Sequence, residues 1–313
     1  MAATTPATLG TAEQEELGEV RTLWQDVWIQ FRKHKGAMVG LAMLTILVLF
    51  AVMGPFFYGI DANAIDFNAL SPSAQGFSAE HPWGADPTGR DMLAMMMAGG
   101  RISLAVGLLA MTISVTLGTT IGIIAGYFPA LDSPLMRITD MFFALPILPL
   151  LLVITLLFRD SLRTVMGPEL GIFVMIVTVI GALSWMSTAR VVRGEVLSVK
   201  NAEFVTAAIS IGTKRRRILM RHIFPNVLGP VMVASALGIA QAIITESALS
   251  FLGLGFPSDF PTWGRLIFDG QVYMKDFPER VFIPGLAISL TVLSVNFIGD
   301  GLRDALDPRL RGK

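Results

Sequence analysis

Six long apolar stretches limit what this chain can fold into more than any other feature of its sequence. A bilayer core about 30 Å thick requires roughly 20 apolar residues in a helix. Stretches approaching this length occur at Ala37–Phe57, Ile102–Phe128, Leu135–Phe158, Gly171–Met186, Val227–Ser250 and Val281–Ile298. With 53% hydrophobic and 15% charged residues, the chain is too apolar for an ordinary soluble domain. The sequence therefore predicts an all-α, polytopic membrane protein with six transmembrane helices.

Prolines and glycines are expected to shape two of these spans. Pro146 and Pro149 lie inside the third stretch and predict a kink, which membrane helices tolerate when neighbouring groups satisfy the freed carbonyls. Small residues recur along the second stretch, at Gly107, Gly118, Gly122 and Gly126. This pattern permits close contact between helices, and packing within the bundle is its simplest interpretation.

Residues 1–36 are interpreted as a tail that ends in an amphipathic helix. The part up to Val20 is small, polar and acidic, a composition typical of disorder, and has no secretory signal pattern. Trp24, Val27, Trp28 and Phe31 then recur at helical spacing. They predict a helix on the membrane surface, with an ordinary juxtamembrane linker as the alternative.

The distribution of basic residues predicts which end of the bundle faces the cytoplasm. Cytoplasmic loops carry the excess of Lys and Arg, and Arg32, Lys33 and Lys35 adjoin the first span. A cytoplasmic N-terminus places 17 of the 24 Lys and Arg residues on that side. The other seven are Arg90, Arg101, Arg159, Arg163, Arg265, Lys275 and Arg280. Both termini and the central polar loop are therefore predicted to be cytoplasmic.

Residues 58–101 and 251–280 are predicted to lie outside the cell. The first segment contains turn-forming Pro and Gly and leads into a short Met-rich helix before the second span. The second has Trp263 at the expected water–lipid boundary. Residues 102–299 then form a core of five helices, which includes the 251–280 loop and a central loop at 200–226. Residues 300–313 form a cytoplasmic tail.

Two sets of side chains near the outer face each admit two interpretations. Met92, Met95, Met96 and Met97 could be soft metal ligands, but packing by flexible apolar side chains is favoured, and no metal site is predicted. Glu246 is the one acidic residue placed within a span, near its outer end. An ionisable group at that depth is a functional candidate, although a local structural role at the membrane interface is favoured.

The polar and basic loop from Ala202 to Asn226 is predicted to form two short helices. Gly212 can adopt the left-handed geometry that ends a helix, and Thr213 is placed to cap the next one. Pro225 is expected to end the second helix, because proline disfavours helical geometry in the preceding residue. A loop that merely obeys the positive-inside rule is the main alternative. A DNA-binding helix-turn-helix is disfavoured, because apolar spans flank the loop on both sides.

The spacing of six residues in this loop resembles the EAA loop of membrane permease subunits of bacterial ABC importers. These residues are Glu203, Ala207, Ala208, Gly212, Ile223 and Pro225. The loop differs from the usual pattern in one respect, because Phe224 precedes Pro225 where leucine is typical. In that family the element inserts into a cleft of the cytoplasmic ATPase subunit. The resemblance implies that Glu203 pairs with the ATPase, that the alanines permit close approach, and that Gly212 forms an elbow.

Further motifs resemble the peptide and nickel branch of these permeases, and in particular its C-type dipeptide and oligopeptide subunits. They are HPWGADPTGRDML and GGRISLAVG around the second span, ESALSFLGLG at 246–255, PTWG after it, and GDGLRDALDPRLR at 299–311. The resemblance covers most of the chain. It implies the type I importer permease fold and a bacterial inner-membrane location.

The resemblance also implies a division of labour among several subunits. The chain contains no GxxxxGK[ST] phosphate-binding motif, so it is predicted not to be an enzyme and to hold no cofactor of its own. ATP and Mg²⁺ would be bound by two cytoplasmic ATPase subunits. The other implied partners are a homologous permease subunit, an extracytoplasmic substrate-binding protein and membrane lipid, with no nucleic acid.

The transported substrate is less well defined than the class of transporter. Peptides are the expected substrate, with nickel chelates or glutathione-like solutes as alternatives in the same family. A gradient-driven secondary transporter is a further alternative. Such transporters usually carry several acids or histidines near the bilayer midplane, whereas here His34, His81 and His222 lie in loops.

Overall fold

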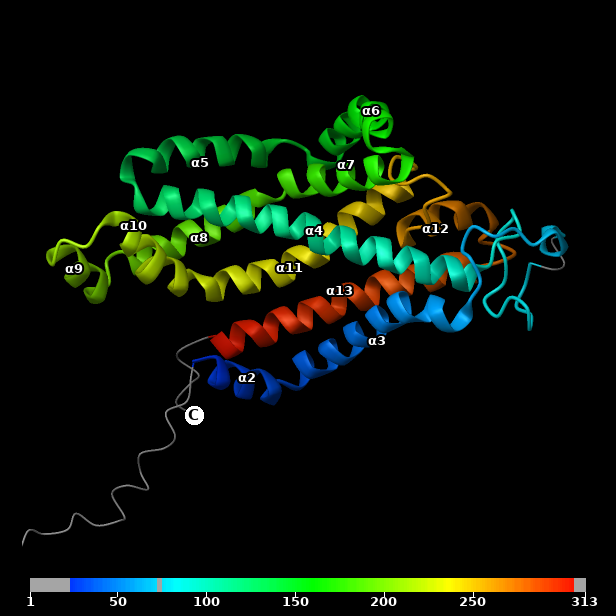
Figure 1. The fold of residues 1–313 in the computed structure, drawn as a ribbon, viewed down its shortest axis with the longest axis horizontal. Helices are drawn as coiled ribbons and strands as arrows, with labels where there is room; N and C mark the ends of the chain where they lie inside the picture. The colour runs from blue at the N-terminus through cyan, green and yellow to red at the C-terminus, as the bar shows by residue number, and fades with distance from the viewer. Residues whose placement is uncertain (1–22, 72–74, 307–313) are drawn as a thin grey trace, which may run out of the picture.

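The computed structural model describes residues 23–71 and 75–306, which form an elongated bundle of helices (Figure 1). Over these two ranges the chain is helical apart from turns and two isolated antiparallel bridges, Ile65 with Arg90 and Ala85 with Asp91. The N-terminal tail and residues 307–313, which carry the end of the last family motif, lie outside the described residues. The prediction of an all-α fold is confirmed.

Within residues 23–71 and 75–306, five helical segments are long and apolar enough to cross a membrane. They are α3 (Lys35–Tyr58), α4 (Met92–Tyr127), Pro168–Val199, Arg215–Phe251 and α13 (Glu279–Leu306). The segment Pro168–Val199 consists of α7 (Pro168–Ala182) and α8 (Trp185–Val199), and Arg215–Phe251 ends in α11 (Phe224–Phe251). A bent pair of helices supplies a sixth span if it is counted as one.

The third predicted span is broken in two rather than kinked. It consists of α5 (Pro129–Ala144) and α6 (Ile147–Met166), which meet at an angle of 85°. Leu145 is extended, with ψ at 135°, as expected for a residue that precedes a proline. Pro146 therefore ends the helix at this point, and a continuous helix over Leu135–Phe158 is wrong. In Figure 1, α5 runs beside α4 whereas α6 turns away from it.

The second span begins at Met92 rather than Ile102, so the predicted Met-rich helix and the span form one continuous helix. Asp91 is the N-cap, and its Oδ1 accepts a hydrogen bond from the N–H of Ala94 at 2.7 Å. Met92, Met95 and Met96 pack against Trp263, the first residue of α12 (Trp263–Gly270). Trp263 is fully buried and donates to the Met96 carbonyl at 3.1 Å, so its side chain packs inside the protein instead of facing water or lipid.

The glycines of α4 allow α8 to approach its backbone closely. A Cβ atom at Gly122 would lie 2.6 Å from the Ala189 carbonyl oxygen, and one at Gly126 would lie 2.7 Å from Cβ of Val196. Gly118 faces Thr188 in the same way, while Gly107 faces Ile243 of α11. The predicted role of these small residues in bundle packing is therefore confirmed.

The amphipathic helix α2 (Leu23–Lys33), which directly precedes α3, packs against the helix bundle. Val27 and Phe31 are buried against Ala37 and Ala305, at the start of α3 and the end of α13. Trp28 is 50% exposed and stacks on Phe31. The helix is confirmed, but Val27 and Phe31 of its apolar stripe pack on the bundle instead of facing lipid.

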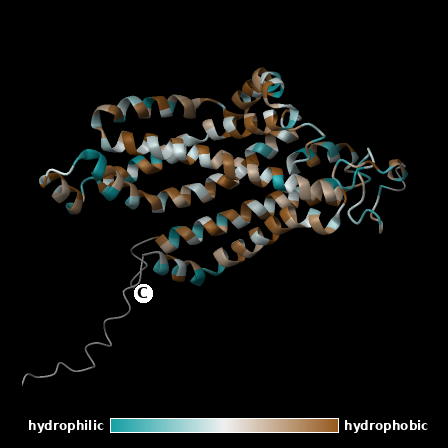
Figure 2. Ribbon diagram, viewed as in Figure 1, coloured by the Kyte–Doolittle hydropathy of each residue, from teal (hydrophilic) through white to brown (hydrophobic). Residues whose placement is uncertain are grey.

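Polar residues gather at the two ends of the bundle and apolar residues cover its middle (Figure 2). One end carries α2, the end of α13, α9 (Glu203–Ser210) and α10 (Arg215–Ile218). The other end carries α12, the 3₁₀ turns Phe67–Leu70 and Gln271–Tyr273, and the loops around them. The two groups of segments that the sequence assigns to opposite sides of the membrane thus lie at opposite ends of the molecule.

Candidate coupling element and groove

The segment Glu203–Pro225, which we call the α9–α10 element, contains the residues with EAA-loop spacing; it comprises α9, α10, the π-helical turn Leu219–Ile223 and the first residues of α11. Helix α9 ends in a Schellman motif, in which the Thr213 N–H donates to Ala208 and the Gly212 N–H donates to Ile209. Gly212 has φ of +77°, a conformation that glycine adopts without strain. No neighbouring atom lies within 4 Å of a Cβ built there, so the backbone angle alone requires glycine. The predicted break at Gly212 is confirmed.

The helix that follows differs from the prediction at both ends. Its N-cap is Lys214 rather than Thr213, and no side chain caps it. Helix α10 continues through a π-helical turn, Leu219–Ile223, directly into α11. Pro225 lies in the first turn of α11, where a residue without an N–H group is tolerated. Pro225 therefore does not end a helix, because the π turn shifts the hydrogen-bond register immediately before it.

Three apolar side chains anchor the element to the bundle. Val205, Ile218 and Ile223 are buried, and they pack with Val192 and Val196 of α8. Ala208 is also buried, at 7% exposure. Of the six residues with EAA-loop spacing, Ala208 and Ile223 therefore face the protein, whereas Glu203, Ala207, Gly212 and Pro225 are exposed.

The outer surface of the element is both apolar and basic. Its exposed large apolar side chains are Phe204, Ile209, Ile211 and Met220, of which Ile211 is 82% exposed. The exposed basic side chains are Lys214, Arg215, Arg216, Arg217 and Arg221. Exposed apolar side chains gathered at one end of a bundle, with charged residues around them, are typical of a protein interface. We call this surface the α9–α10 face.

Ion pairs hold α5 against α8 beside this element. The Arg193 guanidinium contacts both carboxylate oxygens of Asp132, at 2.5 and 2.7 Å. Arg190 contacts Asp140 at 2.6 Å and also lies over the ring of Phe143. A paired, bidentate geometry fixes the relative position of two helices better than a single contact. These ion pairs thus tie α8, the helix that precedes α9 in the chain, to α5.

A groove of about 1160 Å³ runs along α8 and α11. Its walls include residues of α4, α8 and α11, and it reaches from Ile180 and Gln241 to Val199, Asn226 and Leu306. Glu195, Asp300 and Arg303 line the end nearest the α9–α10 element. The groove thus leads from the interior of the bundle to the end that carries the basic helix.

Glu246 of α11 has no exposed surface and no cationic partner among the described residues. Its carboxylate accepts hydrogen bonds from Ser250 at 2.7 Å and from Ser103 of α4 at 3.2 Å. The Ser103 hydroxyl in turn accepts from the N–H of Trp263 at 3.3 Å. Glu246 therefore links α11, α4 and α12 in the protein interior, where its side chain faces neither water nor lipid.

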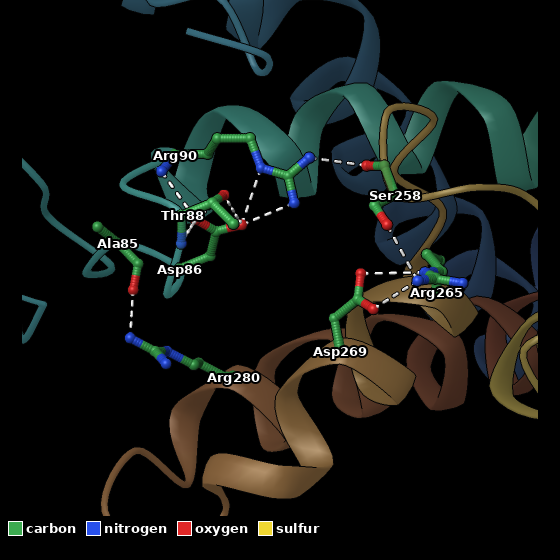
Figure 3. Close-up of polar contacts among 8 residues, drawn as sticks. All are labelled: Ala85, Asp86, Thr88, Arg90, Ser258, Arg265, Asp269 and Arg280. Atoms are coloured by element: carbon green, nitrogen blue, oxygen red, sulfur yellow. Dashed lines mark hydrogen bonds and ion pairs between the residues drawn. The ribbon is translucent and has the colours of Figure 1, made fainter. Parts of the chain in front are cut away.

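The outer segments are joined by buried arginines (Figure 3). Arg90 pairs with Asp86 at 2.7 Å and donates to the Ser258 carbonyl at 2.8 Å. Arg280 donates to the carbonyl of Ala85 and to Gln75. Each arginine therefore connects residues of the 58–101 segment with residues near the 251–280 segment, and the two outer loops form one body.

His81 lies between two aspartates in the same outer region. Its Nδ1 is 2.8 Å from Asp91 and its Nε2 is 3.1 Å from Asp66. The hydrogen bond with Asp91 is the largest cause that raises the pKa of His81 above its ordinary value of 6.5. Hydrogen bonds from the Asn68 backbone and from His81 lower the pKa of Asp66. The three side chains thus form an ionic cluster over the start of α4, which we call the His81 clasp.

The chain matches a known family of membrane transport proteins. A family model described as the inner membrane component of binding-protein-dependent transport systems matches residues 118–312. The chain belongs to this family. A second model, the N-terminal transmembrane domain of oligopeptide transport permease C, matches residues 22–72 of the permease. Membership in this family excludes the gradient-driven secondary transporter that the sequence left open.

Several relatives are similar to this permease over nearly their whole length. The oligopeptide transport system permease protein of Haemophilus influenzae is 40% identical over 296 residues, which is 94% of this chain and 91% of that protein. The dipeptide transport system permease protein of Bacillus subtilis is 40% identical, over 92% of this chain and 86% of that protein. The glutathione transport system permease protein of Pectobacterium atrosepticum is 36% identical, over 93% of each.

Sequence patterns alone missed the residues that line the groove of this permease. Ser114 and Gln241 lie on α4 and α11, which are apolar around most of their circumference, so no amphipathic stripe marks the groove side. Ser184 lies in the break before α8, and Thr188 lies in the first turn of α8. The only available signal was the occurrence of polar residues inside predicted spans. Their common location depends on how α4, α8 and α11 pack together.

Proposed function

We propose that this permease forms half of the translocation pathway of an ATP-driven importer for dipeptides or oligopeptides. The observation that carries the substrate class is the similarity to oligopeptide and dipeptide permeases over more than nine-tenths of the chain. The relative named for glutathione transport carries a peptide-like substrate as well. The groove between α8 and α11 supplies this chain's side of the pathway.

The α9–α10 face is the surface that docks on a cytoplasmic ATPase subunit. Phe204, Ile209 and Ile211 supply exposed apolar area, and Glu203 and Ala207 are exposed on the same helix. The buried residues Val205 and Ile223 have a different role: they transmit a movement of α9 to α8 and α11, on which they pack. Gly212 sets the angle between α9 and α10.

The orientation of the permease in the membrane follows from docking of the α9–α10 face on a cytoplasmic ATPase subunit. The α9–α10 face, the end of α13 and α2 lie on the cytoplasmic side, and the joined outer loops face an extracytoplasmic substrate-binding protein. A homologous permease subunit covers the open side of the groove. The two ATPase subunits bind ATP and Mg²⁺, and this chain contributes no nucleotide site.

Uptake of a labelled dipeptide by cells that depend on this permease tests the proposal. Gly212→Pro is incompatible with φ of +77° and removes the N–H that donates to Ile209. Glu203→Lys reverses a charge on the exposed helix. Both variants are expected to reach the membrane in normal amounts, to reduce uptake at least tenfold, and to recover less ATPase subunit on copurification.

A matched control separates backbone geometry from general damage to the loop. Gly212→Asn is expected to retain most of the uptake, because asparagine tolerates the left-handed conformation better than other non-glycine residues and no atom crowds the site. Wild-type uptake in the double variant Glu203→Lys, Gly212→Pro would contradict the coupling role.

A further inference from the structure

Five polar side chains line the part of the groove farthest from the α9–α10 element. They are Ser114 of α4, Ser184, Ser187 and Thr188 around the start of α8, and Gln241 of α11. We call this set the polar band. Apolar side chains such as Val191, Val233 and Leu237 line the adjacent walls. Polar residues inside membrane spans are costly and commonly mark a substrate pathway, so the polar band requires a functional explanation.

Ser114 provides the most specific observation. It is 1% exposed, and its Oγ is buried without any hydrogen-bond partner. Thr112 and Thr116 on the same helix each donate to a carbonyl four residues earlier, at 2.8 and 2.7 Å. The Ser114 hydroxyl makes no such hydrogen bond with a carbonyl of its own helix. A buried hydroxyl without a partner is unfavourable. The Ser114 Oγ exposes less than 1 Å² in this conformation, so a ligand that displaces the groove side chains covering it would supply the missing hydrogen bond.

The start of α8 adds backbone donors beside these side chains. Helix α7 ends at Ala182, and α8 begins at Trp185 after a break at Leu183 and Ser184. The first N–H groups of a helix have no acceptor within it, and no side chain caps α8. Ser187 and Thr188 lie in the first turn of α8 and also line the groove. Discontinuous helices contribute substrate sites in other transporter folds for the same reason.

We propose that the polar band binds the main-chain amide groups of a peptide in transit. This inference rests on the proposed function, since it requires a peptide in the groove. Hydroxyl and carboxamide groups both donate and accept hydrogen bonds, as a peptide unit does, and they contact the main chain regardless of the peptide's side chains. The apolar walls accommodate those side chains, so the pathway is selective for peptides but tolerant of their sequence.

The dimensions of the groove are consistent with an extended peptide. Along α11 it reaches from Asn226 to Gln241, which is about 22 Å at roughly 1.5 Å per residue. An extended chain of about six residues has the same length. A peptide whose main chain contacts the polar band would therefore extend toward Glu195 and Arg303 at the other end, which can attract its charged termini.

Ser114→Ala tests the proposal with little risk to the fold. Because Ser114 Oγ has no partner in the protein, its removal is expected to leave thermal stability unchanged or slightly higher. Transport of labelled trialanine by the complete importer in proteoliposomes is expected to fall about two- to tenfold, the value of one hydrogen bond. ATP hydrolysis stimulated by loaded binding protein is expected to remain normal, so fewer peptides are imported per ATP.

Thr119→Val is the matched control. Thr119 lies on the same helix, is 8% exposed and has an unpartnered buried hydroxyl, but it does not line the groove. Normal trialanine transport in Thr119→Val, together with the loss in Ser114→Ala, supports the polar band. Equal losses in both variants would overturn it, since burial rather than substrate contact would then explain the effect.

A second variant protects the test against a small single-residue effect. Ser114→Ala, Ser184→Ala, Gln241→Leu removes three members of the polar band and is expected to reduce transport more than Ser114→Ala does. Wild-type transport in this triple variant would refute the binding role while leaving the proposed function intact. Failure of the wild-type importer to transport any peptide would instead refute the proposed function.

Discussion

Glu246 shows how one residue can hold three helices together inside the bundle. Its carboxylate is the common acceptor for Ser103 and Ser250, and Ser103 connects it to the backbone of Trp263. Glu246→Leu leaves these hydroxyls without their acceptor, at a cost of about 1–3 kcal/mol. Glu246→Gln keeps one acceptor oxygen and is expected to be clearly less destabilising. Thermal unfolding of the purified complex in detergent measures the difference.

Glu169 supplies the control for Glu246, because it is an exposed glutamate in the first turn of α7. Glu169→Gln and Glu169→Leu are expected to differ little in unfolding temperature. Similar unfolding temperatures for Glu246→Gln and Glu246→Leu would show that the hydrogen bonds of Glu246 do not stabilise the bundle.

At the scale of helices, the contact between α4 and α8 depends on the absence of side chains. A Cβ atom at Gly122 would lie 2.6 Å from a backbone oxygen and 2.8 Å from Cβ of Val192, and neither atom can move without shifting α8. Gly122→Val is therefore expected to destabilise the permease by at least about 1–3 kcal/mol, the usual cost of overpacking. A lowered unfolding temperature and a lower yield of assembled complex would report this effect.

The partner helix contains a control for Gly122. Gly194 lies inside α8, and a Cβ built there meets no atom within 4 Å. Gly194→Ala is expected to be neutral or to stabilise α8 by about 0.5–1 kcal/mol, through helix propensity alone. Equal destabilisation by Gly122→Val and Gly194→Ala would indicate that helix packing does not distinguish the two positions.

Elements were predictable from the sequence where a local signal exists. The existence of the apolar spans other than the broken third one, the small-residue face of α4 and the turn at Gly212 all follow from composition or from single residues. The start of α4 could also have been predicted, because aspartate, here Asp91, is a preferred N-cap residue. The Pro and Gly residues around Asp91 instead favoured the prediction of a loop. The π turn before Pro225 has no comparable signal, since it depends on how Ile223 and Val227 pack against α8.

At the scale of the whole molecule, some features depend on how the helices are placed relative to one another, and sequence patterns do not predict these features. The residues of the polar band come from three helices separated by long stretches of chain. Uniformly apolar helices reveal neither which side faces lipid nor which faces the groove. The same limit applies to the contacts of Arg90 with Ser258 and of Arg280 with Gln75, because each joins residues that are far apart in the sequence.

The two ends of the molecule are expected to respond differently to pH, because only the outer end carries the His81 clasp. The pKa of His81 is raised by its hydrogen bond with Asp91, so its contribution to stability is fully present below about 6.5 and is lost as the pH rises through the raised value. The pKa of Asp66 is lowered, so its contribution is present above 3.8 and is lost only in stronger acid.

Hydrogen exchange of the assembled permease can measure this difference. Raising the pH from about 6 to about 9 is expected to reduce the protection of residues 59–71 and 75–91 in wild type, after correction for the intrinsic exchange rate. The protection of α9 and α10 is expected to change little over the same range. In His81→Gln the outer loop lacks the ionic contribution at every pH, so its protection is lower near pH 6 and nearly independent of pH. An equal pH response of the outer loop in wild type and His81→Gln would assign the response to other groups, because Asp66 and Asp91 remain in both proteins and only the imidazole is absent from the variant.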